Sequence, residues 1–281
     1  MALVPAAVLL DDAREADVAV GAFNVITLEH AEAVVAGAER AGRPVVLQLS
    51  ENAIAFHRSP DAIAAACVAV AREASVDVAL HLDHVTGDAL VRRTAELGFS
   101  SVMYDGSTHP YEQNVAATAD AATWASENGV WLEAELGEVG GKDGAHAPGV
   151  RTDPAEAAAF VDATGVDSLA VAVGSSHAMT TQDARLDHDL IRALRDAVPV
   201  PLVLHGSSGV PDDELRAAVE AGMVKINVGT ALNVAFTGAV RARLASDDAV
   251  TDPRKYLAGA RDAVSDVVAH VLGVLALSPG S

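Results

Sequence analysis

Three histidines stand at the ends of apolar, β-branched runs and could together bind a metal ion. VDVALHLDH ends in His84, SLAVAVGSSH ends in His177, and VPLVLHGSSG carries His205. Imidazoles at the end of a strand that is buried on both faces are costly unless they bind something or one another. Three neutral imidazoles leave one coordination position open, which is the arrangement of a catalytic zinc site. We therefore favour a metal site over the alternative of three separate hydrogen-bonded core histidines.

Carboxylates lie at the ends of the same kind of run and could move protons. Asp83 precedes His84 and is a candidate general acid or base, the alternative being that it only orients a histidine. Asp105, Glu133 and Glu135 stand in two further strand-like runs. Because side chains alternate along a strand, Glu133 and Glu135 share one face. At least one of them should point toward the histidines, unless the two belong to a polar core layer.

Turns rich in glycine and hydroxyl side chains could hold a phosphate. HGSSGV (205–210) and NVGT (227–230) each precede a predicted helix, whose first N–H groups attract anions. Either turn alone is a weak signal, but the two follow neighbouring strands, where barrel enzymes commonly bind phosphate. A third stretch, GEVGGKDGAHAPG (137–149), has the glycines of a mobile lid or of a solvated connection.

The elements that must position these residues alternate regularly between strand and helix. Polar residues gather at the C-terminal ends of the strand-like runs. In a (β/α)8 TIM barrel these ends meet at one mouth, whereas in a doubly wound open sheet they spread along an edge. We therefore predict an α/β fold, a single barrel domain over residues 1–281. The predicted strands are 21–25, 43–50, 76–84, 100–107, 130–137, 168–177, 199–209 and 223–230, with helices at about 28–42, 59–75, 86–98, 110–129, 154–165, 188–198, 211–222, 230–246 and 255–277.

Composition and charge indicate a globular protein and argue against nucleic-acid and membrane partners. The chain has 281 residues, 51% of them hydrophobic, which is typical of a globular protein. Its 39 acidic and 19 basic residues argue against a nucleic-acid partner, because phosphate backbones are bound by clustered lysine and arginine. Cys67 is the only cysteine and falls in an alanine-rich helical pattern, which indicates inert packing. No bilayer-spanning or secretory segment is evident, so a cytoplasmic protein with no membrane partner is expected.

An ordered set of motifs resembles the class II (zinc-dependent) ketose-bisphosphate aldolases, which include the fructose- and tagatose-1,6-bisphosphate aldolases. The motifs are GAFNV, HLDH, LEAELG followed by GG, VDSLAVAVGSSH, LHGSSG and VKINVGT, and the likeness covers nearly the whole chain. The resemblance implies a lyase of carbohydrate metabolism, as in glycolysis. Such an enzyme reversibly cleaves a ketose (bis)phosphate into dihydroxyacetone phosphate and an aldehyde. It implies Zn²⁺ as a Lewis acid in place of a lysine Schiff base, leaves open a monovalent cation near the phosphate, and implies a homodimer or homotetramer.

The resemblance also implies a role for individual residues. Asp83 would exchange a proton with a substrate hydroxyl. Asn24 and Asn227 would orient substrate hydroxyls, and Ser50 would lie near the ketose. The residues implied at the zinc ion are His84, His177 and His205, with Glu135 able to approach it and Asp105 nearby. The residues implied at the phosphates are Gly206, Ser208 and Thr230 for dihydroxyacetone phosphate and Arg254 for the far phosphate.

Four departures from the family pattern bear on the substrate. Lys142-Asp143 stands where the fructose branch has an acidic pair, so the enolising base would be Asp143. Ala178 replaces a glycine beside the phosphate, and Ser175-Ser176 replaces the commoner Thr-Ala. Gly229 replaces an aspartate of the fructose branch, which favours the tagatose-like and broader ketose-phosphate subgroup.

Two other functions fit the same pattern. One is a non-catalytic barrel that stabilises a separate aldolase, although retention of the three histidines and Asp83 argues against it. The other is a metal-dependent sugar-phosphate isomerase or epimerase, which needs no pocket for a second substrate. Bound zinc would discriminate against the first alternative, and product analysis would discriminate against the second.

Overall fold

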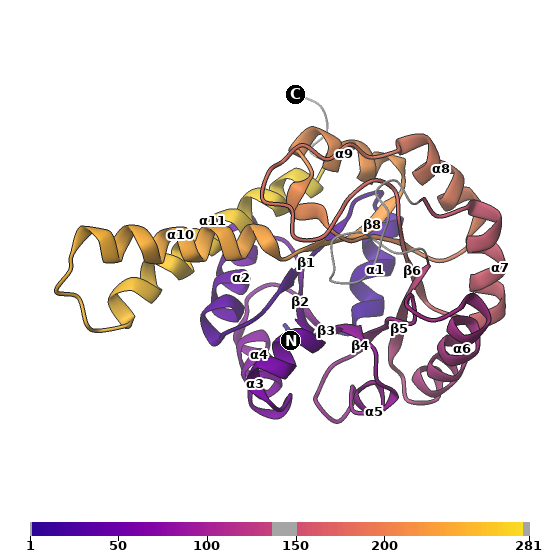
Figure 1. The fold of residues 1–281 in the computed structure, drawn as a ribbon, viewed down its shortest axis with the longest axis horizontal. Helices are drawn as coiled ribbons and strands as arrows, with labels where there is room; N and C mark the ends of the chain where they lie inside the picture. Colours follow the sequence, from indigo (N-terminus) through magenta and orange to yellow (C-terminus); the bar gives the residue numbers. More distant parts are fainter. Residues whose placement is uncertain (1, 137–150, 278–281) are drawn as a thin grey trace.

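Eight parallel strands close into a barrel in which each strand pairs with its neighbours in sequence order (Figure 1). The structure is a computed structural model that describes residues 2–136 and 151–277. The last strand pairs with the first, with Val20 opposite Lys225. This closure confirms the predicted TIM barrel and excludes the open sheet, which would leave two unpaired edges. The strands are β1 (Val20–Asn24), β2 (Val45–Ser50), β3 (Val78–Val85), β4 (Ser101–Tyr104), β5 (Trp131–Leu136), β6 (Ser168–Val171), β7 (Leu202–Leu204) and β8 (Met223–Val228).

Helices between the strands form the outer layer. Local sequence explains several of their ends. The side chain of Asp153 accepts hydrogen bonds from two N–H groups of the helix that starts at Pro154, as its N-cap position predicts. Gly42 ends another helix in the left-handed conformation, at φ 61°. The helices are α1 (Ala6–Glu15), α2 (Leu28–Ala41), α3 (Glu51–His57), α4 (Asp61–Glu73), α5 (Asp88–Val91), α6 (Tyr111–Glu127), α7 (Pro154–Thr164), α8 (His188–Ala197), α9 (Asp212–Ala221), α10 (Thr230–Ser246) and α11 (Arg254–Leu275), with a 3₁₀ turn at Ser207–Gly209.

The segment after β3 corrects one prediction. A helix was expected over 86–98, but regular α-helix covers only α5, and turns follow it. Both the N–H and the hydroxyl of Thr94 donate to the carbonyl of Val91, three residues back. A side-chain hydroxyl that bonds in this way competes with the regular i→i+4 pattern. The short helices α1 and α3 were also not predicted.

Apolar side chains close one end of the barrel, and the other end is open to a ligand. A large apolar cluster fills the space between the strands and the outer helices. A smaller cluster lies at the other end of the strands, where Leu9 and Leu10 of α1 pack against Val20 and Val46. Full burial of a leucine side chain contributes about 2 kcal/mol, so α1 closes this end firmly. The C-terminal ends of the strands form the open mouth.

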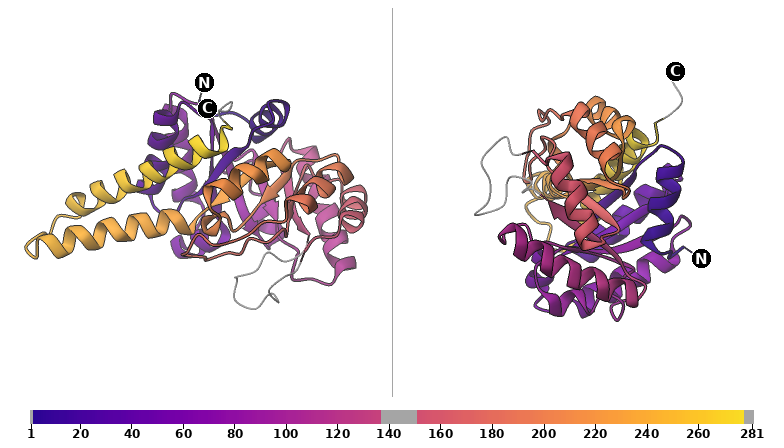
Figure 2. Two further views of the ribbon diagram at one scale, coloured as in Figure 1. Left: turned by 90° about the horizontal axis from the view of Figure 1, so that it is seen from above. Right: turned by 90° about the vertical axis from the view of Figure 1, so that its right-hand side faces the viewer.

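α10 and α11 form an antiparallel pair that projects from the barrel (Figures 1 and 2), and we call this pair the arm. α10 begins at the barrel mouth, and α11 returns to pack against α2. Gly37 of α2 permits a close approach there, because a Cβ at this position would lie 2.7 Å from the carbonyl oxygen of Ser265. The turn between the two helices lies at the far end of the arm.

Two further features are the lengths of the apolar helices and the environment of the single cysteine. Within the described part of the chain no single helix is long and apolar enough to cross a membrane, although α3 and α4, bent by 116°, pass that test as a pair by length and composition. Cys67 is buried in α4, as its pattern predicts. Burial raises the pKa of its thiol to about 12, which keeps it neutral and unreactive at physiological pH.

Candidate active site

A pocket of about 600 Å³ lies at the mouth of the barrel. Its wall includes the ends of β1, β2 and β3 on one side and the turns after β6, β7 and β8 on the other. Polar side chains dominate this wall, and five of them are the carboxamides of Asn24, Gln48, Asn52, Asn227 and Asn233. None of the described residues that line it is lysine or arginine.

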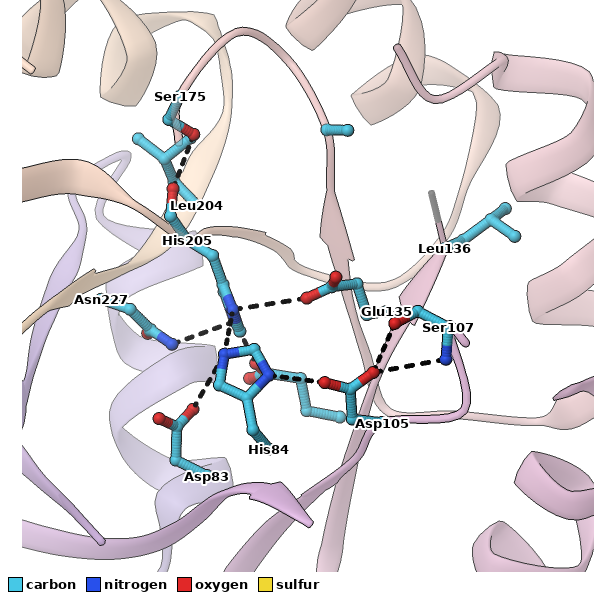
Figure 3. Close-up of polar contacts among 12 residues, drawn as sticks. Asp83, His84, Asp105, Ser107, Glu135, Leu136, Ser175, Leu204, His205 and Asn227 are labelled. Carbon is cyan, nitrogen blue, oxygen red and sulfur yellow. Dashed lines mark hydrogen bonds and ion pairs between the residues drawn. The ribbon is translucent and has the colours of Figure 1, made fainter. Parts of the chain in front are cut away.

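His84 and His177 line this pocket, and together with the buried His205 and Glu135 they form a group that could hold a metal ion. His84 comes from β3, Glu135 from β5, and His177 and His205 follow β6 and β7. One nitrogen or oxygen of each residue lies within 4.8 Å of those of the others. Figure 3 shows His84 and His205 facing each other, with Glu135 beside them.

A bulge in β3 turns two consecutive side chains toward the mouth. Successive side chains of a regular strand point to opposite faces, so Asp83 and His84 could not both face the pocket. The pairing of β3 with β4 shifts register between Leu82 and Val85, and His84 takes a left-handed conformation at φ 50°. A bulge of this kind re-aims a side chain at the cost of local strain. Both residues consequently line the pocket.

The hydrogen bonds of His84 and His205 leave one nitrogen of each ring with a lone pair that could bind a metal ion. Nδ1 of His84 lies 2.8 Å from Asp105, and Nε2 of His205 lies 3.0 Å from Glu133. Each carboxylate accepts the ring hydrogen, so the other nitrogen of each ring carries a lone pair. These two nitrogens are 3.1 Å apart, close to the roughly 3.3 Å between ligands in a tetrahedral zinc site. The donor set therefore fits a metal ion, with Asp105 orienting a ligand.

Asp83 lines the pocket with one carboxylate oxygen held by a hydrogen bond and the other without one. Its Oδ2 accepts a hydrogen bond of 3.0 Å from Asn24, while Oδ1 is buried without a hydrogen-bond partner and lies 3.9 Å from Nε2 of His84. Burial alone would raise the pKa of Asp83, but the surrounding histidines, His84 foremost, outweigh burial and hold the pKa well below its usual range. An ionised Asp83 can accept a proton from a bound hydroxyl.

Gln48 extends this arrangement and was missed by sequence analysis. Its Nε2 donates a hydrogen bond of 3.0 Å to Oδ1 of Asn24, which in turn donates to Asp83. Gln48 thus fixes the orientation of the Asn24 amide and, through it, of the carboxylate. The sequence signal was a glutamine in the otherwise apolar run VVLQLS.

The other side of the pocket can hold an anion. Gly206, Ser208 and Thr230 line it, and α10 begins at Thr230 with its N-terminal N–H groups at the pocket. Ser208 accepts a hydrogen bond from the N–H of Ala231, which ties the turn after β7 to that helix. A Cβ at residue 206 would lie 2.6 Å from the carbonyl group of Ser176, so only glycine allows these two turns to approach.

Of the four remaining predicted site residues, two line the pocket, one lies outside its lining, and one lies outside the described part of the chain. Ser50 lines the pocket, and its hydroxyl caps α3 by accepting from the N–H of Ala53. Asn227 lines the pocket and lies 3.0 Å from Nε2 of His205. Arg254 lies at the far end of the arm, outside the pocket lining, with its side chain 89% exposed and paired with Asp252. Asp143 lies outside the described residues, so its role stays a prediction.

Comparisons with known proteins point to the same family as the ordered sequence motifs. The family model described as class-II fructose-bisphosphate aldolase matches residues 4–278. A fructose-bisphosphate aldolase from Geobacillus stearothermophilus is 39% identical over 272 residues, covering 95% of each chain. The crystal structure of the YdjI aldolase from Escherichia coli K12 superposes with a TM-score of 0.85 at 30% identity, covering 97% of each chain. A fructose-bisphosphate aldolase structure from Campylobacter jejuni, at 22% identity and a TM-score of 0.83 over 97% of this chain and 95% of that one, shares the fold.

The family match spans almost the whole chain, and the residues at the barrel mouth fit the chemistry of an aldol cleavage. The resemblance drawn from the ordered motifs is thereby confirmed. The chain belongs to the class-II fructose-bisphosphate aldolase family, and it is an aldolase, a carbon–carbon lyase.

Proposed function

We propose that the protein is a zinc-dependent aldolase that reversibly cleaves a ketose 1,6-bisphosphate into dihydroxyacetone phosphate and an aldehyde. The observation that carries this proposal is the meeting of two half-sites in one pocket. His84, His177, His205 and Glu135 form a group that could hold a metal ion on one side, and the N-terminus of α10 offers an anion site on the other. A ketone phosphate spans such a pair of sites.

Zinc is the metal that the donor set favours. Three imidazoles and a carboxylate suit Zn²⁺ in a catalytic site. Bound there, the ion supplies Lewis-acid polarisation of the substrate ketone. The pocket wall has no lysine among the described residues, which agrees with a mechanism that needs no Schiff base.

The residues of the chain account for the proton transfer that starts cleavage. Asp83, ionised and with no hydrogen bond to its Oδ1, accepts the proton of the hydroxyl at C4. The C3–C4 bond then breaks, the C4 oxygen becomes the aldehyde oxygen, and the electron pair of the bond stays on C3. A proton returned to C3 by Asp143, the predicted enolising base, would complete dihydroxyacetone phosphate. Asn24 and Gln48 keep Asp83 aligned throughout.

Gly229 supports a tagatose-type substrate over a fructose-type substrate. A Cβ at this position would lie 2.7 Å from Oδ1 of Asn24, an oxygen that is held by Gln48. An aspartate here, as in the fructose branch, would displace Asn24 and disturb its bond to Asp83. Because this chain has Gly229 where the fructose branch has an aspartate, we expect tagatose-1,6-bisphosphate to be cleaved faster than fructose-1,6-bisphosphate.

The test combines metal analysis with cleavage of both sugars by the purified protein. We expect about one zinc per chain, cleavage of either bisphosphate, and loss of zinc and activity in His84→Ala. His270→Ala is the matched control, because this histidine is exposed on α11 and pairs with Asp212. This variant should keep its zinc and its cleavage activity. Protein without bound metal after gentle purification would contradict the proposal. Bound zinc without cleavage of either sugar would reject the bisphosphate substrate.

A further inference from the structure

A buried lysine lies inside the barrel beneath the histidine cluster. Lys225 of β8 is the only lysine or arginine among the buried residues that the structure describes, and 2% of its side chain is exposed. Taking an ammonium group out of water is costly unless it is paired. A leucine or methionine would fill the same space without that cost. The position of this charge therefore needs a reason.

Glu133 of β5 pairs with Lys225 and joins it to a metal ligand. Its Oε2 lies 2.8 Å from Nζ of Lys225, and its Oε1 lies 3.0 Å from Nε2 of His205. All three side chains are buried. The ammonium group of Lys225 donates to Oε2 and holds the carboxylate in place, with Oε1 directed at His205. Glu133 therefore meets His205 as an anion.

The hydrogen bond between Glu133 and His205 decides which nitrogen of His205 carries the hydrogen. A neutral imidazole has one N–H and one lone pair. Two groups meet Nε2, the Glu133 carboxylate and the Nδ2 of Asn227, each at 3.0 Å. The carboxylate is charged and therefore the stronger partner, so it accepts the hydrogen from Nε2 and leaves the lone pair on Nδ1, 3.1 Å from Nε2 of His84. Without Lys225 the carboxylate loses the partner of its Oε2 and can turn away from Nε2, which allows the ring hydrogen to lie on Nδ1. A hydrogen at Nδ1 blocks metal binding.

His81 is the other neighbour of Lys225, and it leaves Glu133 as the only partner of opposite charge for the lysine in this buried group. Nε2 of His81 lies 3.4 Å from Nζ of Lys225, while Nδ1 of His81 bonds to the hydroxyl of Ser101 at 2.7 Å. Burial and the adjacent Lys225 lower the pKa of His81 to about 3, so this ring is neutral. His81 accepts a hydrogen from Lys225 and offers no competing negative charge.

We propose that Lys225 is a positioning residue of the metal site, which through Glu133 keeps the hydrogen of His205 on Nε2 and its Nδ1 available for the ion. The pair acts before any substrate binds, because it presets one of the ligands. This inference rests on the proposed role of His205 as a metal ligand. Lys225 itself contacts neither the metal group nor the pocket.

The experiment measures zinc affinity by competition with a chromophoric chelator, on the whole protein and without substrate. Lys225→Met and Glu133→Gln should each weaken zinc binding by roughly 10- to 100-fold. The double variant should be no weaker than the worse single variant, because both changes remove one interaction. Ser101→Ala is the control: it disturbs the same buried network on the far side of His81 and should leave zinc affinity within about threefold of the wild type.

Spectra of the imidazole ¹⁵N nuclei in the metal-free protein provide a second readout that a loss of packing alone would not move. The wild type should show the hydrogen of His205 on Nε2, and Lys225→Met should shift it toward Nδ1. Unchanged zinc affinity in Lys225→Met would overturn the inference. If that variant does not fold, a wild-type His205 with its hydrogen on Nδ1 would overturn it equally. A wild type that binds no zinc would instead refute the metal role in the proposed function.

Discussion

Two residues of the candidate metal site and its surroundings hold a backbone conformation that residues other than glycine rarely adopt. His84 has φ 50° and Ala178 has φ 60°. Left-handed backbone costs a non-glycine residue about 1–2 kcal/mol, and such strain gathers at functional sites. His84 must keep its imidazole, so the strain there cannot be removed without losing the ligand. Ala178 carries only a methyl group, and the family pattern has glycine at this position.

Replacing Ala178 with glycine should therefore stabilise the protein. Relief of the left-handed strain exceeds the entropy that glycine adds to the unfolded chain, and we expect a gain of about 0.5–1 kcal/mol in the free energy of unfolding. Urea unfolding measures the change. Ala116→Gly, on the exposed face of α6, is the matched control and should lose about 0.5–1 kcal/mol. Equal losses in the two variants would show that Ala178 is unstrained.

At the scale of elements, sequence patterns revealed the strands more reliably than their contacts. Apolar runs separated by helical patterns located all eight strands, because a strand buried on both faces leaves a plain signature. The predicted strands 168–177 and 199–209 were too long, since β6 ends at Val171 and β7 covers only Leu202–Leu204. The strand ends located His84, His177 and His205. Gln48 and Lys225 went unassigned because their roles depend on partners in other strands, and the register between strands is not visible in a single sequence. The region 86–98 was misread because its hydrophobic spacing does not separate i→i+3 turns from a regular helix.

The contact between α2 and α11 gives an element-scale prediction. A Cβ at Gly37 would lie 2.7 Å from the carbonyl oxygen of Ser265 and 2.7 Å from Cβ of Val268. Backbone atoms cannot rotate away, so Gly37→Ala should push the helices apart and lower the free energy of unfolding by about 1–3 kcal/mol. Gly273→Ala in α11 meets no atom within 4 Å and should gain up to about 1 kcal/mol. Thermal unfolding of both variants checks the difference, and a shared sign would disprove the role of close packing.

At the scale of the whole molecule, the arm carries apolar side chains that the barrel does not cover. Among the 17 residues of α10 only Leu232 is fully buried. Val234 is 53% exposed and Leu244 is 41% exposed. Arg254, which the family pattern links to the far phosphate, lies on the arm outside the pocket of its own chain. A second copy of the chain is the occupant that would account for both observations, and we propose a homo-oligomer built through the arm.

Light scattering tests this assembly. The wild type should have two or four times the chain mass of 28.7 kDa. Val234→Glu and Leu244→Glu place a charge on the arm and should lower the mass toward that of one chain. Val8→Glu is the control, because Val8 is 44% exposed on α1 at the opposite end of the barrel, and it should not change the mass. A wild type of one chain mass would rule the assembly out.

The pairing of β1 with β8 has a consequence for synthesis on the ribosome. β1 ends at Asn24, and the strand that completes its hydrogen bonds begins at Met223, about 200 residues later. At roughly 5–20 residues per second, the ribosome needs about 10–40 s to make that stretch. During this time β1 presents an unpaired edge, the kind of surface to which other chains add strands. The barrel is therefore most exposed to aggregation, and most in need of a chaperone, before its final strand emerges.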